Sequence, residues 1–163
     1  MTAYLITGEA GTGKSSLVAE LRRRGYLAYD ADLTLSSHTD LATGKPLAEK
    51  LDHYAKTSWM WDAARLREIL DTCKDVFLTG ASDNQHEFYP LFAKIFILTI
   101  DATRLTQRLQ NRHPGDYGMH PEELQEILRT FEGFTRRTIE DGAIPVDATQ
   151  PLGAVVDEIL AHL

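Results

Sequence analysis

Residues 3–7 read AYLIT, and they lead directly into a loop that reads GEAGTGKS at residues 8–15. Three glycines within six positions give up conformational order, so such a loop exists where the backbone must turn tightly or approach a ligand closely. The run before the loop is short and apolar like a buried strand, and apolar residues after the loop repeat at helical spacing. The sequence therefore predicts a strand, a glycine loop and a helix over about 14–24.

Four further short apolar runs follow the first, and stretches long enough for helices separate them. Alternating strands and helices indicate a parallel sheet that helices cover on both faces. The runs lie at residues 26–29, 76–79, 94–100 and 143–146. The sequence contains no internal repeat, low-complexity tract or linker, so residues 1–163 are predicted to form a single α/β domain.

Charge and cysteine usage narrow the classes of partner. The formal net charge of -7 argues against a protein that coats a nucleic-acid polymer, because such binding needs many cationic contacts to phosphates. Cys73 is the only cysteine, so an intrachain disulfide is excluded and a reducing compartment is expected. With no leader-like start and no apolar run of membrane length, we expect a cytoplasmic protein without a membrane partner, either a monomer or a homodimer.

The glycine loop matches a phosphate-binding pattern of glycine, four residues, glycine, lysine and serine. Backbone N–H groups around Gly11 and Gly13 can curl about a phosphate, and the N-terminus of the next helix adds its dipole. Lys14 is expected to reach the outer phosphates and Ser15 to ligate Mg²⁺. A glycine-rich turn ahead of a helix is the structural alternative. The predicted nucleotide contacts are Gly8, Glu9, Ala10, Gly11, Thr12, Gly13, Lys14, Ser15 and Ser16.

With this motif the sequence resembles the small P-loop kinases, a group that includes shikimate, gluconate and nucleoside monophosphate kinases and nucleoside-kinase-like proteins. The resemblance extends over nearly the whole chain, and the P-loop is its one highly specific motif. It implies a P-loop NTPase three-layer sandwich whose five parallel strands have the order 2-3-1-4-5. It also implies transfer of the γ-phosphoryl group of ATP, with Mg²⁺, to a hydroxyl or phosphate group of a small-molecule acceptor.

Two aspartates close the second apolar run, in AYDAD at residues 28–32. Residues two apart in an extended segment point the same way, so Asp30 and Asp32 are expected to present paired carboxylates beside the P-loop. By the resemblance, Asp30 is the metal-side residue and Asp32 is the catalytic base on the acceptor side. A polar turn after a strand, where aspartate is common, is the alternative.

Arginines recur every four residues in TRLTQRLQNR, which places Arg104, Arg108 and Arg112 along one helix face. The resemblance implies that Arg108 and Arg112 stabilise the transferring phosphoryl group, that Arg108 also contacts the nucleotide, and that a lid spans about 112–121. A solvated helix face is the alternative, and for Arg104 both interpretations stay open.

The last apolar run continues into PVDATQPL at residues 145–152. This segment resembles the adenine-side loop of the small P-loop kinases, which implies that Asp147 contributes to nucleotide binding. A capping or turn role for Asp147 is the alternative.

Residues that could recognise the acceptor are scattered along the chain. Trp59 and Trp61 offer flat rings for a base or sugar, although core packing is expected for at least one of them. Polar side chains follow the third apolar run in GASDNQ at residues 80–85, and His38 is expected in a polar loop. A nucleoside or nucleotide is the favoured acceptor. A sugar acid, an antibiotic, or no acceptor at all in an ATP-binding regulatory module are the alternatives.

Several features limit the resemblance. The third apolar run ends in VFLTGAS and lacks the metal-supporting aspartate of a usual Walker B strand, which leaves Asp30 or water to support the metal. The triple-glycine element of shikimate kinases is reduced to GAS, so shikimate is not the first choice. A regulatory GTPase is disfavoured because no Asn-Lys-x-Asp motif occurs, and an AAA+ motor with a helical lid domain is expected to need a longer chain.

Overall fold

The computed structural model describes residues 2–47, 57–72 and 75–163, so Cys73 lies outside the described residues. A five-stranded parallel sheet forms the centre, with the order β2-β5-β1-β6-β7. Its strands are β1 (Thr2–Thr7), β2 (Leu27–Asp30), β5 (Asp75–Thr79), β6 (Lys94–Thr99) and β7 (Ile144–Asp147). They coincide with the five apolar runs, and counted in chain order they follow the predicted order 2-3-1-4-5.

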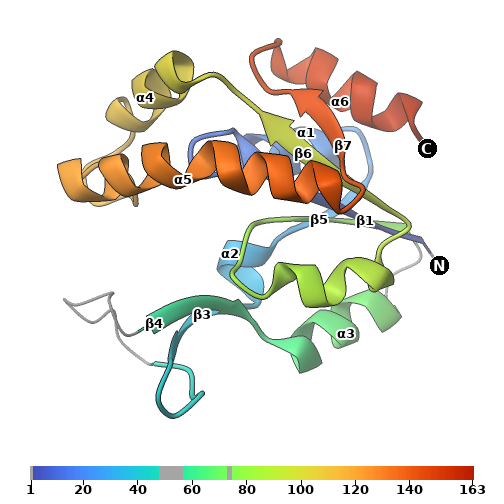
Figure 1. The fold of residues 1–163 in the computed structure, drawn as a ribbon. Coiled ribbons are helices and arrows are strands. Elements are labelled where there is room, and N and C mark those ends of the chain that lie inside the picture. Colours follow the sequence, from blue (N-terminus) through green and yellow to red (C-terminus); the bar gives the residue numbers. More distant parts are fainter. Residues whose placement is uncertain (1, 48–56, 73–74) are drawn as a thin grey trace.

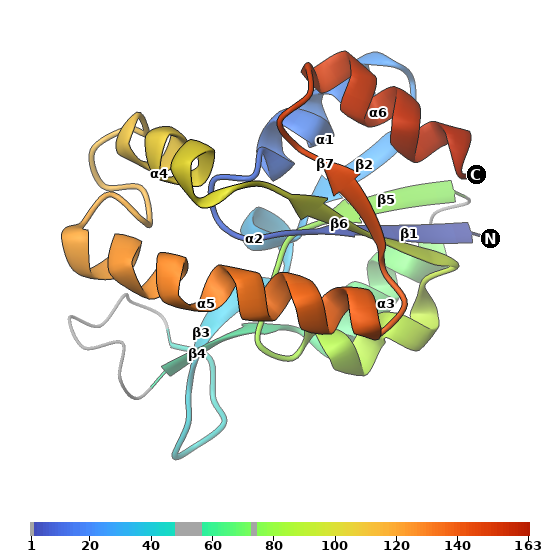
Figure 2. The same cartoon turned by 45° about the horizontal axis from the view of Figure 1, so that its top comes forward.

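Helices pack against both faces of the central sheet, so the molecule has three layers (Figure 1). The helices are α1 (Lys14–Arg23), α2 (Ala31–Thr34), α3 (Ala63–Thr72), the 3₁₀ helix η2 (Gln85–Leu91), α4 (Ala102–Gln110), α5 (Pro121–Glu140) and α6 (Leu152–Ala161). Leu5 and Ile6, neighbours on β1, enter opposite cores because side chains alternate along a strand. The core around Ile6 is closed by α1 and α6, which Figure 2 shows on one side of the sheet, and the core around Leu5 is closed by α3 and η2.

A third, smaller core joins α4 to α5. Leu105 and Leu109 on α4 are fully buried and pack against Ile127 and Phe131 on α5. Because this contact fixes the two helices to each other, it also fixes both ends of the loop at 111–120, where the sequence predicts a lid. Pro121 occupies the first turn of α5, where its missing N–H leaves no helical bond unmade. Although α5 is long, none of the helices in the described ranges is apolar enough to cross a membrane.

A β-hairpin stands apart from the central sheet. Its strands, β3 (Ser36–Asp40) and β4 (Thr57–Trp61), pair antiparallel with each other and form a separate two-stranded sheet. The expectation that His38 lies in a loop is therefore wrong, because His38 pairs with Trp59 across the hairpin. The sequence SSHTD shows no apolar alternation, and all five of its residues are only half-buried, so the pairing with β4 determines its strand conformation.

Candidate active site

The P-loop lies between β1 and α1, as the sequence predicts. Gly13 caps α1 with a φ of 101°, a left-handed conformation that favours glycine and turns the backbone into the helix. The hydroxyl of Thr12 donates to the carbonyl oxygen of Glu9 at 2.8 Å. The ammonium of Lys14 donates to the carbonyl oxygens of Gly8 at 2.7 Å and Glu9 at 3.1 Å. The side chain of Lys14 thus folds back over the P-loop, and its hydrogen bonds stabilise the curved conformation of that loop.

Burial lowers the pKa of Lys14, while the charges of Asp32 and Glu9 act in the opposite direction and favour its protonated form. The lowered pKa reports a cation that has lost much of its hydration. A desolvated cation at the N-terminus of a helix is well prepared to meet the charge of a phosphate.

The hydroxyl of Ser15 donates to Oδ2 of Asp30 at 2.9 Å, which joins the P-loop to the end of β2. Asp30 is buried, and its second oxygen accepts from the backbone N–H of Asp32 at 3.0 Å. A hydroxyl oxygen and a carboxylate oxygen are ligands that suit Mg²⁺, which takes few protein ligands and completes its shell with phosphate oxygens and water. No cluster of three or more acidic, histidine or cysteine side chains suited to a metal occurs among the described residues, so the phosphates would have to supply the other ligands.

The side-by-side arrangement expected for Asp30 and Asp32 is wrong in its geometry. The chain leaves β2 at Asp30 and turns at once into α2, because the Asp30 carboxylate caps that helix at the N–H of Asp32. The two residues therefore do not lie two apart on one extended segment. Both carboxylates still act on Lys14, since each raises the pKa of that lysine.

Asp32 is half-buried and lies on the wall of a large cleft of about 1360 Å³. The indole Nε1 of Trp59 donates to its Oδ1 at 3.2 Å, and the backbone of Ala81 also hydrogen-bonds to the carboxylate. Burial raises the pKa of Asp32, while the positive charge of Lys14 and the Trp59 hydrogen bond oppose that shift. Asp32 is thus a carboxylate more basic than an exposed one, held next to the P-loop lysine, as a general base requires.

Arg108 reaches from α4 across the P-loop. Its Nη1 donates to the carbonyl oxygen of Thr12 at 3.2 Å and its Nη2 to that of Ala148 at 2.7 Å. Arg112 lies one turn further along, and its Nη1 donates to the carbonyl oxygen of Tyr117 in the predicted lid at 2.7 Å. Arg104 is exposed, its Nε lies 3.7 Å from Oδ2 of Asp101, and it lines neither of the two cavities described below, which favours the solvated interpretation for this residue.

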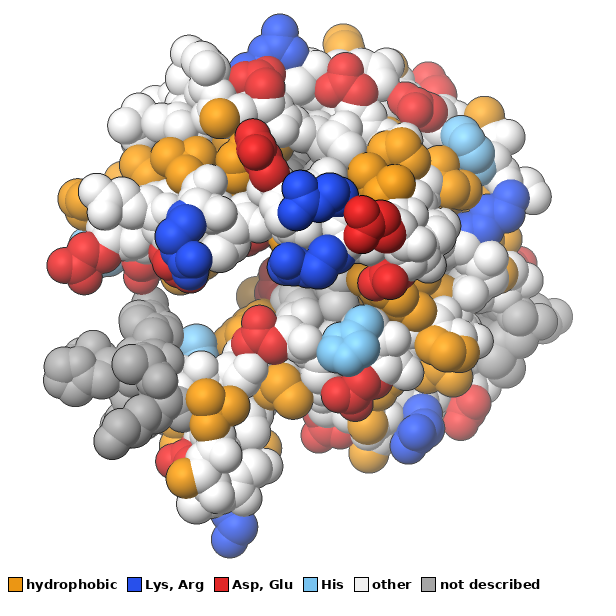
Figure 3. All heavy atoms as spheres, viewed as in Figure 1, with side chains coloured by type: hydrophobic (Ala, Val, Ile, Leu, Met, Phe, Trp, Pro, Cys, Tyr) orange, Lys and Arg blue, Asp and Glu red, His pale blue; other side chains and the backbone are white. Residues whose placement is uncertain are grey.

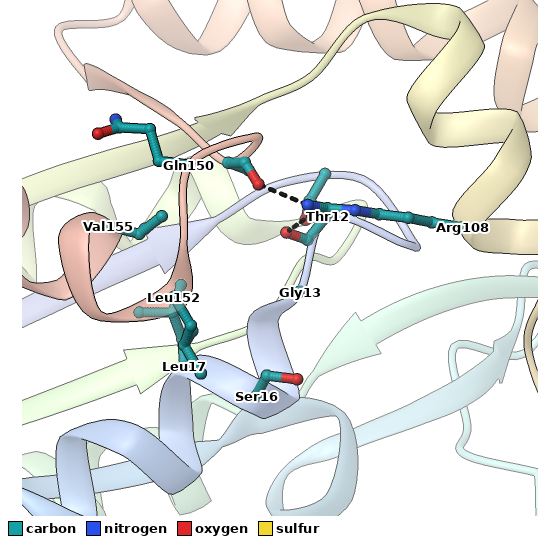
Figure 4. A pocket seen from close by; sticks show the side chains of 9 residues that line it. Thr12, Gly13, Ser16, Leu17, Arg108, Gln150, Leu152 and Val155 are labelled. Carbon is teal, nitrogen blue, oxygen red and sulfur yellow. Dashed lines mark hydrogen bonds between the residues drawn. The ribbon is translucent and has the colours of Figure 1, made fainter.

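A cavity of about 290 Å³ lies on the outer side of the P-loop, next to α6 (Figure 4). Figure 4 shows Arg108 reaching toward Thr12, with Gln150, Leu152 and Val155 on the facing loop and helix. Apolar side chains beside backbone polar groups suit a flat nitrogen heterocycle. The complete lining is Thr12, Gly13, Ser16, Leu17, Arg108, Ala148, Gln150, Leu152 and Val155.

Asp147 is exposed and is not among the residues that line either cavity. Its Oδ1 accepts from the backbone N–H of Thr149 at 2.8 Å and from the Thr149 hydroxyl at 2.6 Å, and these bonds lower the pKa of Asp147. The carboxylate therefore stabilises the turn that presents Ala148 and Gln150 to the cavity.

The large cleft, about 1360 Å³, lies on the other side of the P-loop, between α5 and the hairpin, and Figure 3 shows the molecule hollowed there. Its volume exceeds what one drug-sized ligand needs, so a nucleotide tail and a second molecule can share it. Most predicted P-loop contacts line it: Glu9, Ala10, Gly11, Gly13, Lys14, Ser15 and Ser16. Gly8 lies behind this surface and contributes its carbonyl oxygen to Lys14.

The hairpin and the loop after β5 form the wall opposite α5. Trp59 lines the cleft and meets the ring of His38 edge-to-face, with ring centres 4.8 Å apart. Trp61 is 3% exposed and packs on Phe88, so core packing is confirmed for this tryptophan. Of the polar side chains after β5, Gln85 lines the cleft, whereas Asn84 is bonded to the backbone of Trp61.

Gln85 is 3% exposed and highly constrained. Its Oε1 accepts from the hydroxyl of Thr7 at 2.9 Å, and its Nε2 donates to the hydroxyl of Tyr89 at 2.7 Å. Asp83 also lines the cleft, and its carboxylate accepts from the Ser58 hydroxyl and from the backbone N–H of Trp59 at 2.9 Å. These bonds fix the β5 loop to the hairpin and so set the shape of this wall.

The cleft residues on α5 were missed in the sequence. Phe134, Arg137 and Thr138 line the cleft, and their spacing of three and four places them on one face of the helix, while Asp141, which caps its C-terminus, also lines the cleft. The signal was present, because polar and aromatic residues recur there beside the apolar stripe. The apolar spacing of α5 by itself indicates only a helix with one packed face, and it does not show that the neighbouring face lines a cleft.

Comparison with known proteins agrees with this architecture. A family model described as an AAA domain matches residues 5–129, more than half of the chain. A deoxyadenosine kinase from M. mycoides with bound dATP has a TM-score of 0.61 at 16% identity, covering 99% of this chain and 98% of its own. A gluconokinase from Sinorhizobium meliloti 1021 has a TM-score of 0.55 at 23% identity, covering 98% and 90%.

A sugar kinase from Janibacter sp. HTCC2649 is similar to the same extent, with a TM-score of 0.55 at 18% identity over 99% of this chain and 93% of its own. At such low identities the structural likeness shows a common P-loop α/β fold. Among curated protein sequences, none matches the chain.

Proposed function

This chain belongs to the AAA domain family, and on that premise we propose that it is an ATP-dependent kinase that transfers the γ-phosphoryl group to a small-molecule hydroxyl. A nucleoside or nucleotide is the favoured acceptor. One observation carries the proposal: the half-buried carboxylate of Asp32, with its raised pKa, lines the same cleft as the desolvated ammonium of Lys14, and their charges act on each other. A phosphate site and a base therefore share one cleft.

Positive charge converges where the phosphates would lie. Lys14, Arg108 and Arg112 come from the P-loop and from the last turns of α4 and the loop after it, and all three line the large cleft. Phosphoryl transfer depends mainly on positioning and on stabilising the charge of the equatorial oxygens, so these cations are suited to the transition state. Mg²⁺ held by Ser15 and Asp30 would neutralise further charge on the β- and γ-phosphates.

The proposed reaction is an in-line displacement. The acceptor oxygen forms a bond to the γ-phosphorus while the bond from that phosphorus to the β–γ bridging oxygen breaks, and ADP leaves with the electron pair. Asp32 accepts the proton of the acceptor hydroxyl. Its raised pKa makes the carboxylate a stronger base than an exposed aspartate, and the Trp59 hydrogen bond holds the oxygen in place.

A purely regulatory ATP-binding module is the competing function. Such a module needs the P-loop but has no use for a desolvated carboxylate in an adjoining cleft. Holding Asp32 against its tendency to protonate opposes folding, and groups held in this way are typical of catalytic sites. The placement of Asp32 therefore favours an enzyme.

The test is acceptor-dependent ADP formation from Mg·ATP with pools of nucleosides, nucleotides, hydroxy acids, polyols and antibiotics. One pool is expected to raise ADP release well above the ATP-only rate. In the active pool, Asp32→Asn should lower kcat by about 100-fold or more with ATP affinity retained, because a general base contributes that much. Asp75→Asn, at the start of β5 and exposed, is the matched control and should keep wild-type activity. Bound ATP with a flat response in every pool would reject the kinase.

A further inference from the structure

Charges of both signs line the large cleft, but their proportions differ between its two ends. The cations Lys14, Arg108 and Arg112 lie at the P-loop end. Towards the hairpin and α5, the only lysine or arginine among the described lining residues is Arg137. Five carboxylates line that part of the cleft: Asp83, Glu122, Glu123, Glu126, which is itself paired with Arg129 at 2.6 Å, and Asp141. The P-loop end therefore carries three cations beside the carboxylates of Glu9 and Asp32, whereas acidic side chains outnumber basic ones in the rest of the described lining.

The pKa values of two tyrosines in the cleft also show the effect of these carboxylates. The pKa of Tyr117 is raised, first by burial and then by the carboxylates of Glu9, Glu123, Glu126 and Asp83. These four side chains come from the P-loop, from α5 and from the loop after β5, so their fields meet inside the cleft. Burial raises the pKa of Tyr89 as well, and Asp141 adds to that shift.

Anionic small molecules are normally recognised by arginines that face a carboxylate or phosphate directly. Arg137 is a poor candidate for such a role here. It is exposed, and Asp141 lies four residues further along the same helix face, where its charge opposes an incoming anion. Like charges brought together in a partly desolvated site are strongly disfavoured, and so they select against the wrong ligand.

The ring of Trp59 offers a surface that favours a ligand with a flat ring. Its Nε1 is bonded to Asp32, so the indole stands directly beside the proposed base, and His38 supports it from the other strand. Phe134 on α5 lines the same cleft. A molecule whose hydroxyl meets Asp32 therefore has aromatic surface next to it on which a flat ring can stack.

We propose that the acceptor is a flat-ringed hydroxyl compound without carboxylate or phosphate groups, and that the acidic walls exclude its anionic counterparts. This inference rests on the proposed kinase function. It favours a nucleoside over a nucleotide and disfavours a sugar acid, distinctions that the P-loop alone cannot make.

The test measures acceptor binding without turnover, by calorimetry in the presence of Mg·ADP. Each probe pair differs in charge: ribonucleosides against their 3′-monophosphates, which keep the 5′-hydroxyl, and glucitol against gluconate. We expect a neutral ribonucleoside to bind at least tenfold more tightly than its 3′-monophosphate. Equal or tighter binding of the anionic members, or no binding by any neutral ring compound, would overturn the inference.

Measuring ADP formation on the same pairs separates the two proposals. A neutral preference in binding with no ADP release would support the acceptor class and reject the kinase. Rapid phosphorylation of an anionic member would support the kinase and reject the acceptor class.

Substitutions in the cleft test which residues cause the preference for neutral over anionic compounds. Asp141→Asn should reduce the preference for the neutral member severalfold, whereas Asp75→Asn, at the opposite end of the sheet, should leave that preference unchanged. The opposite result would be that an anionic probe binds tightly, and that Arg137→Ala weakens its binding tenfold while Arg136→Ala does not. Arg137 would then bind the anionic group, and the inference would fail.

Discussion

The indole Nε1 of Trp59 donates a hydrogen bond of 3.2 Å to Oδ1 of Asp32. The two residues lie 27 positions apart, one on β4 of the hairpin and one on α2 at the end of β2. The bond favours the ionised carboxylate in surroundings that otherwise favour its protonation. The hairpin therefore helps to set the protonation state of the proposed base.

Replacing Trp59 with Phe should shift the acid limb of the pH profile. The substitution removes a hydrogen bond that lowers the pKa of Asp32, so that pKa rises and a higher pH is needed to ionise the base. The acid limb of kcat/KM, which reports the free enzyme, should move to higher pH. Trp61→Phe is the control, because Trp61 lies in the core. An unmoved limb in Trp59→Phe would mean that Asp32 is not the titrating base.

Asp32→Asn should make the protein more stable at neutral pH while removing its activity. Burial raises the folded-state pKa of Asp32 above its unfolded value, so stability is lost as pH rises from the unfolded pKa through the folded pKa. Asparagine carries no charge and avoids this loss. The Tm of Asp32→Asn should exceed that of the wild type at pH 7, and the difference should vanish when acid protonates Asp32 in both states. A lower Tm at pH 7 would show that the pairing with Lys14 outweighs burial.

Removing the Arg108 guanidinium should loosen the nucleotide site. Arg108→Ala leaves the carbonyl oxygens of Thr12 and Ala148 without their donor, and hydrogen bonds from a charged group contribute about 1.5–3 kcal/mol each. We expect a lower free energy of unfolding and a higher Kd for ATP, measured by denaturation and calorimetry. Arg104→Ala, one turn earlier and exposed, should change each by less than about 0.5 kcal/mol. Similar effects of the two substitutions would contradict the role given to Arg108.

The Ser15 hydroxyl should be needed for metal use. Ser15→Ala removes the oxygen that bonds Asp30 at 2.9 Å, so half-maximal activity should require several times more Mg²⁺. Ser15→Thr keeps a hydroxyl and should behave like the wild type. A magnesium titration of ADP formation distinguishes the three proteins. The prediction fails if Ser15→Ala follows the wild-type curve.

Gly80 should tolerate no side chain. A Cβ at this position would lie 2.7 Å from the Cβ of Ala31, and the φ of 153° is itself unusual for other residues. Gly80→Ala should cost about 2–4 kcal/mol of unfolding free energy. Gly142→Ala is the matched control: its φ of 102° is also strained, but no atom lies within 4 Å, so only about 1–2 kcal/mol should be lost. Equal losses would show that Ala31 moves aside.

The sequence was most informative where one local signal determines the structure. The five strands follow from short apolar runs, of which the three central ones are buried on both faces, and the P-loop follows from a spacing with few structural solutions. The acceptor wall was not predictable to the same degree. Strand β3 has no apolar alternation, and α5 presents its cleft face only because α4 and β6 orient it.

Asp30 and Asp32 show what could not be predicted from the sequence. Their proximity to the P-loop was correctly expected, but the path of the backbone was not. The strand ends at Asp30 because the carboxylate of Asp30 accepts a hydrogen bond from the N–H of Asp32 and so caps α2. Whether the chain continues as a strand or begins a helix therefore depends on this one hydrogen bond. The alternation of side chains along an assumed strand gives no sign that the strand stops there.

The hairpin of β3 and β4 is bonded to itself as a separate sheet, while the P-loop belongs to the central one. In the proposed function, the part of the acceptor wall that the hairpin supplies is therefore built on a different sheet from the one that carries the P-loop. Insertions, recombination or laboratory evolution in the hairpin can then change what the protein accepts without rebuilding how it holds a nucleotide. A chimera that receives this ribbon from another P-loop protein is the natural engineering experiment on this modularity.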